Sequence, residues 1–70
     1  MSLAFAPFGK IFTVTDMKMD DKTKRHLGNL GILIGTELVS VFDNKGDVII
    51  KVKDSKLAIN KALALKIIVA

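Results

Sequence analysis

The side chains that could perform catalysis are few and are scattered along the chain. His26 is the single histidine, and cysteine is absent. The serines belong to different parts of the chain, with Ser2 near the N-terminus, Ser40 in an expected strand and Ser55 in an expected turn. Nucleophilic catalysis needs a hydroxyl or thiol beside a base that a third group orients. No spacing in the sequence implies such an arrangement, and we therefore expect no catalytic residues and no enzyme.

The adjacent carboxylates of Asp20 and Asp21 could in principle act as an acid and a base. They directly precede a helical pattern, however, where carboxylate oxygens accept hydrogen bonds from free amide groups and suit the positive end of the helix dipole. The phosphate-binding patterns G-x-x-x-x-G-K-[ST] and G-x-G-x-x-G do not occur. We therefore expect these carboxylates to cap a helix.

Potential metal ligands occur in one stretch of the chain, at Met17, Met19, Asp20, Asp21 and His26. Affinity for first-row metals usually comes from several imidazole or thiolate ligands, and this stretch offers one imidazole. The sequence therefore predicts no metal site and no cofactor within one chain. A divalent metal shared between chains is kept as an alternative.

Length and composition limit the architecture to one dense domain over residues 1–70. Half of the residues are hydrophobic (50%), and the mean hydropathy is +0.41. The N-terminus lacks the basic segment of a signal peptide, and no apolar run approaches the roughly 20 residues of a membrane span. With cysteine absent as well, we expect a cytoplasmic protein that does not insert into a membrane.

The pattern of β-branched and apolar residues predicts about five short strands. Their expected ranges are Lys10–Lys18, Thr36–Asp43, Asp47–Lys53, Leu57–Ile59 and Lys66–Val69. One helix is expected over Asp21–Leu30, with Gly31 as its left-handed C-cap. Asn60 is expected to cap a helical turn over Lys61–Leu65, and Leu3–Gly9 to form a turn or a helical cap.

Short strands joined by tight turns favour a mostly β fold, a small SH3-like barrel with one inserted helix and a helical turn near the C-terminus. Closure of such a barrel removes exposed strand edges. Leu27 and Leu30 are expected in the core, and the phenylalanines in the core or its lid; these are Phe5, Phe8, Phe12 and Phe42.

The charge of +4 and the pI of about 9.6 make nucleic acid the main rival class of partner. Basic residues gather in the helix at 22, 24 and 25 and in a second cluster at 51, 53 and 56. Single-strand binders combine such charge with aromatic side chains that stack on bases, and this chain has no Trp or Tyr. Nucleic acid is therefore not the expected partner.

Read as a whole, the chain resembles the ferrous iron transport protein A family. The likeness is an ordered series of segments: LAFAPFG at 3–9, RHLGNLGILIGTEL at 25–38, GDVIIKVK at 46–53 and LAINKALALKI at 57–67. Two positions depart from the family pattern, because Ile34 stands where proline is common and Asp54 where a turn glycine is usual.

The resemblance implies a small accessory protein of ferrous iron uptake. Its expected partner is the ferrous permease, transport protein B, on which it would dock at the cytoplasmic side of the membrane. Two contact surfaces are expected. The helix surface comprises Lys24, Arg25, His26, Asn29 and Leu33, and the N-terminal lid comprises Leu3, Phe5 and Phe8.

Three alternatives to this role stay open. One is a small basic nucleic-acid-binding barrel. Another is a metal-sensing or metal-bridged module like the C-terminal domain of iron-dependent repressors. Association of several copies of the chain is also kept open.

Overall fold

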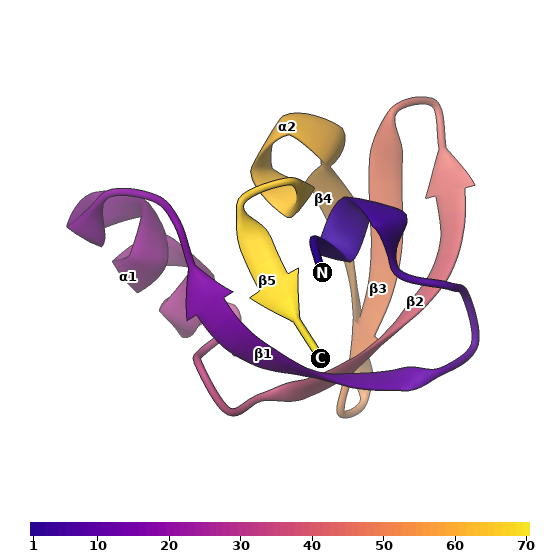
Figure 1. Cartoon of the computed structure of the whole chain (residues 1–70), viewed down its shortest axis with the longest axis horizontal. Helices are drawn as coiled ribbons and strands as arrows, with labels where there is room; N and C mark the ends of the chain where they lie inside the picture. Colours follow the sequence, from indigo (N-terminus) through magenta and orange to yellow (C-terminus); the bar gives the residue numbers. More distant parts are fainter.

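The computed structural model describes all 70 residues. Five antiparallel strands form one curved sheet in the order β4-β3-β2-β1-β5 (Figure 1). The strands are β1 (Ile11–Met17), β2 (Glu37–Asn44), β3 (Asp47–Val52), β4 (Ser55–Asn60) and β5 (Ile67–Val69). The helices are η1 (Leu3–Phe5, a 3-10 turn), α1 (Asp21–Asn29) and α2 (Lys61–Ala64). The expected mostly β class, with five strands and one inserted helix, is confirmed.

The boundaries differ from the expected ones by a few residues, most of all in β4. This strand begins at Ser55, two residues before the expected Leu57, because the β3–β4 turn is tight. Val52 already pairs with Ser55 across a turn of two residues, so pairing begins as soon as the chain has reversed. The helix α1 ends at Asn29, and Leu30 is its C-cap.

A β-bulge in β1 sets which side chains enter the core. Alternation along a strand would place Met17 on the same face as Thr13 and Thr15. The register shifts between Val14 and Asp16, and this extra residue turns Met17 inward, where it pairs with the buried Ile67. The bulge thus lets β1 contribute both Val14 and Met17 to one core.

The core contains 14 buried apolar residues from every element of the fold. They are Leu3, Ala6, Val14, Met17, Leu27, Ile32, Leu38, Val48, Ile50, Val52, Ile59, Ala64, Ile67 and Val69. Neither α1 nor α2 has the length or apolar character that a transmembrane helix requires.

The N-terminal residues complete the sheet beside β5. The Val69 amide donates to the Met1 carbonyl at 2.7 Å, and Ser2 forms an isolated bridge with Ile68. The Ser2 hydroxyl also donates to the carbonyl of Leu65 at 2.9 Å. Figure 1 shows the two ends of the chain close together next to β5. One edge of the sheet is therefore covered by the chain's own N-terminus.

Two residues expected in the core or its lid, Leu30 and Phe42, are exposed and belong to neither. Leu30 is exposed, because α1 has ended before it and the next inward position is taken by the fully buried Ile32. Phe42 is exposed on β2, whereas Phe12 is half-buried and packs against the core. Phe5 and Phe8 are exposed, which agrees with a place in the lid and not in the core. In the N-terminal segment the inward positions belong to Leu3 and Ala6, so the phenylalanines between and after them face solvent.

Candidate docking site

The loop between α1 and β2, residues 30–36, is held in one conformation by its own hydrogen bonds. The Thr36 hydroxyl accepts from the Leu33 amide at 3.1 Å and donates to the Gly31 carbonyl at 3.2 Å. The Thr36 amide donates to the Leu33 carbonyl at 3.0 Å. Gly31 and Gly35 adopt φ values of +94° and +95°, a region that residues with a β-carbon rarely occupy. The loop is therefore ordered without help from a partner.

Neighbouring elements fix both ends of this loop. The Gly35 amide donates to the Val14 carbonyl at 2.8 Å, and the Val14 amide donates to the Thr36 carbonyl at 2.9 Å, so one end extends the β1–β2 pairing. At the other end the Ile32 amide donates to the Leu27 carbonyl at 2.9 Å, and the Ile32 side chain is fully buried. Backbone hydrogen bonds thus fix both ends of the loop to the rest of the barrel.

This ordered loop presents two large apolar side chains to solvent. Leu33 is 55% exposed and Ile34 is 62% exposed. Leu33 lies across α1 at Gly28, where an added β-carbon would stand 3.0 Å from the Leu33 Cδ2 atom. The absence of a side chain at Gly28 therefore allows Leu33 to rest on the helix.

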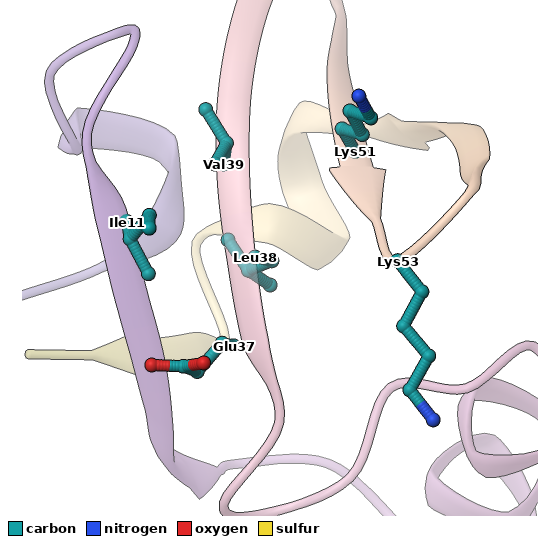
Figure 2. A pocket seen from close by; sticks show the side chains of 6 residues that line it. All are labelled: Ile11, Glu37, Leu38, Val39, Lys51 and Lys53. Atoms are coloured by element: carbon teal, nitrogen blue, oxygen red, sulfur yellow. The ribbon is translucent and has the colours of Figure 1, made fainter.

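A groove continues from the loop onto the outer face of the sheet. It consists of two open hollows of about 490 Å³ and 240 Å³, which share Glu37 and Lys53. Figure 2 shows the second hollow, with Ile11 on β1, Val39 on β2, Lys51 on β3 and Lys53 in the β3–β4 turn. We call this surface the loop groove and define it by Ile11, Leu33, Ile34, Glu37, Val39, Lys51 and Lys53.

The loop groove combines exposed apolar side chains with lysines. Ile11 is 68% exposed although it belongs to a strand. Lys51 stands directly opposite Lys56 in the β3–β4 pairing, an arrangement of like charges that weakens a sheet. Lys53 adopts a φ of +54° in the β3–β4 turn, a conformation that glycine and asparagine occupy at lower cost. The groove can therefore contact apolar groups and anions at the same time.

The helix surface lies beside the loop groove and meets it at Leu33. Arg25, His26 and Asn29 are exposed, and Lys24 is half-buried. Residues three and four apart are neighbours on a helix, which places Lys24 and Arg25 one turn before the position where Leu33 crosses α1. The structure thus connects this expected surface to the groove through one residue.

The N-terminal lid divides into one buried and two exposed residues. Phe5 is 70% exposed and Phe8 is 53% exposed. Leu3 is fully buried, because the 3-10 turn η1 directs it into the barrel, and its side chain offers no surface to a partner. This corrects the expectation that Leu3 itself forms part of a contact surface.

Sequence reasoning missed Ile11, Ile34, Lys51 and Lys53 as members of one surface. A signal for Ile11 was present, since it shares the outward face of its strand with Thr13. Ile34 lies beyond the end of α1, and its exposure follows from its place in the α1–β2 loop.

The carboxylate of Asp20 acts as a helix cap, as predicted. The Thr23 amide donates to the Asp20 Oδ1 atom at 2.9 Å. Hydrogen bonding from Thr23, through its side chain and its backbone amide, holds the pKa of Asp20 below its ordinary value of 3.8. Met17 is buried, Met19 is half-buried and His26 is exposed, and no three His, Cys, Asp or Glu side chains gather where they could hold a metal.

Comparison with known proteins places this geometry in a family. The family model described as FeoA domain matches residues 1–70 of the chain. The chain belongs to the FeoA domain family. It is 37% identical over 67 residues to an Fe(2+) transport protein A of Methanocaldococcus jannaschii, covering 96% of this chain and 82% of that protein. The chain is thus an FeoA-like accessory protein of ferrous iron transport.

Solved FeoA structures share the fold over the whole chain. The FeoA protein of Chlorobium tepidum superposes with a TM-score of 0.89 at 21% identity, covering 99% of this chain and 68% of that one. The zinc complex of Stenotrophomonas maltophilia FeoA, described as a procaryotic SH3 domain protein, gives a TM-score of 0.76 at 19% identity and covers 100% and 89%. The expected SH3-like barrel is confirmed.

Proposed function

We propose that this FeoA-like protein docks on the ferrous permease, transport protein B, at its cytoplasmic side and modulates transport through that contact. The loop groove is the proposed contact surface. The observation that carries this proposal is the ordered α1–β2 loop, which holds Leu33 and Ile34 exposed in one hollow of the loop groove. In this role the protein is cytoplasmic and stays at the inner face of the membrane through its partner.

Two physical arguments support the loop groove as a binding surface. Clustered exposed apolar side chains rimmed by polar groups mark sites of protein contact. Binding also costs less when the contact residues are already ordered, because fewer rotamers and backbone states are lost. The hydrogen bonds of Thr36 and the glycine conformations supply that order here.

The test is a titration of the isotope-labelled protein with the isolated cytoplasmic domain of a matching ferrous permease, with and without GTP, followed by NMR. We expect saturable shifts at Ile11, Leu33 and Ile34. The variant Leu33→Ser should bind more weakly, whereas Leu65→Ser, which removes an exposed leucine outside the groove, should bind like the wild type. Equal binding by both variants would exclude the loop groove as the contact surface.

The exposed phenylalanines of the N-terminal lid form the second candidate contact surface. The same titration assigns them a role if shifts concentrate at Phe5 and Phe8, both of which are exposed. The matched variant is Phe5→Ser, which removes a large exposed apolar group outside the core. Unchanged affinity of this variant would exclude Phe5 as a contact residue.

Docking is proposed to need no resident metal or cofactor, and a metal shared between chains is the alternative. Calorimetry of the purified protein with Fe²⁺ and Zn²⁺ tests this point. Sedimentation with and without the same ions tests association of copies. Absence of a defined stoichiometry and of a metal-dependent change in mass would agree with the proposal, and a metal-dependent dimer would contradict it.

A further inference from the structure

Basic side chains outnumber acidic side chains in the loop groove. Lys51 and Lys53 line it, and Lys56 stands opposite Lys51 on the neighbouring strand. The one carboxylate that lines the groove belongs to Glu37, and Figure 2 shows it pointing toward β1 while Lys53 extends in another direction. The lysine ammonium groups are therefore available to anions of a partner.

Lys53 occupies a backbone position that disfavours lysine. Its φ of +54° lies in the left-handed region, where glycine and asparagine are the ordinary residues. Strained conformations of this kind are concentrated at functional positions. Lys53 also lines both hollows of the loop groove. The β3–β4 turn therefore holds Lys53 at the junction of the two hollows, where its charge faces both.

The apolar part of the groove limits what the anion can be. Exposed side chains of Ile11, Leu33 and Ile34 adjoin the lysines, so a ligand must cover apolar surface and carry negative charge together. A free phosphate or the backbone of a nucleic acid would satisfy the lysines alone. Hollows of about 240 Å³ and 490 Å³ have the size of a few side chains.

We propose that the loop groove binds an acidic, apolar segment of the partner protein. Apolar side chains of the segment contact Ile11, Leu33 and Ile34, and its carboxylates pair with Lys51 and Lys53. This inference rests on the proposed docking function and names the chemistry of the segment that is recognised.

The test uses two short synthetic peptides that share their valines and leucines and differ only in charge, one with glutamates and one with lysines. We expect the glutamate peptide to shift the NMR signals of Ile11, Leu33 and Ile34, and its affinity to fall as salt is raised. The lysine peptide should produce no saturable shifts. Equal binding of both peptides, or shifts of the glutamate peptide outside the groove, would overturn the proposal.

Lysine variants with the same backbone geometry sharpen the test. Lys53→Asn should weaken binding of the glutamate peptide by up to about fivefold, the upper limit for one exposed charge pair. Lys45→Asn is the matched control, because Lys45 has a φ of +49° in the β2–β3 turn and lies outside the groove. Asparagine suits the left-handed region, so both variants should melt no lower than the wild type. Equal affinity of the two variants would contradict a role for Lys53.

The permease domain separates this inference from the docking function. If the domain binds the groove equally well in wild type and Lys53→Asn, and salt has no effect, the acidic segment is excluded and docking stands. If the glutamate peptide binds and the domain does not, the charge chemistry of the groove stands and the permease is excluded as the partner. If RNA or anionic vesicles bind the groove and the glutamate peptide does not, the proposal of an acidic protein segment fails.

Discussion

At the scale of single residues, Ser40 is the one buried polar side chain, and its hydroxyl has no hydrogen-bond partner. Burying a hydroxyl without a partner costs free energy, because its hydrogen bonds to water are lost and not replaced. We expect Ser40→Ala to raise the free energy of unfolding by about 1 kcal/mol. Urea unfolding of the two proteins measures the difference. A loss of stability in the variant would show that the hydroxyl forms a bond in solution.

Asp20 makes the stability of α1 depend on pH. Its pKa is lowered in the folded chain by hydrogen bonding from Thr23, so the folded state binds the proton more weakly than the unfolded state. The stabilisation is therefore complete above the ordinary pKa of 3.8 and is lost as the pH falls through the lower pKa of the folded state. Asp20→Asn keeps a capping oxygen without the charge.

We expect the wild type to lose more stability than Asp20→Asn as the pH falls below about 4, the region of an ordinary aspartate pKa. Unfolding by urea at several acidic pH values gives both profiles. Parallel profiles of the two proteins would mean that the cap does not discriminate between the charged and the neutral side chain. Asp20→Ala, which has no capping oxygen, serves as the control and should be less stable at every pH.

At the scale of elements, Gly28 links the stability of α1 to the position of Leu33. Glycine inside a helix costs up to about 1 kcal/mol relative to alanine, and an added β-carbon would lie 3.0 Å from the Leu33 Cδ2 atom. Leu33 is exposed and its side-chain end can move away. We expect Gly28→Ala to raise the melting temperature and to weaken binding of the permease domain, because Leu33 no longer rests on the helix.

Melting curves and the titration described above measure the two effects of Gly28→Ala separately. Lys22→Ala is a control on the same helix, because Lys22 is exposed and lies outside the helix surface. It should not displace Leu33 and should leave the groove's contribution to binding intact. If Gly28→Ala were more stable and bound the permease domain normally, the contact of Leu33 with α1 would be irrelevant to docking.

The elements themselves could be predicted from local patterns, and the groove could not. Asp20, Gly31 and Asn60 marked helix ends correctly, because capping is a property of a few neighbouring residues. The bulge in β1 and the left-handed turn at Lys53 depend on pairing with other strands. Leu33 was identified through the family resemblance, whereas the proximity of Ile11 and Lys51 arises only when the sheet is assembled.

At the scale of the whole molecule, the N-terminal segment covers the β5 edge of the sheet and contributes to the core. Met1 and Ser2 pair with β5 through backbone groups, and Leu3 fills the core with no exposed surface. A domain of this size has a total stability of only about 4–10 kcal/mol. One large buried side chain at the closing edge therefore contributes a sizeable share of the whole.

We expect Leu3→Ala to lower the free energy of unfolding by about 2–5 kcal/mol, the usual cost of an internal cavity left by leucine. Phe5→Ala, two residues later on the exposed side of η1, should change it by no more than about 0.5 kcal/mol. Urea unfolding of both variants makes the comparison, with hydrogen exchange of β5 as a second measurement. In Leu3→Ala the β5 amides should exchange faster. If the two variants were equally stable, the buried Leu3 side chain would contribute nothing measurable to the stability of the fold.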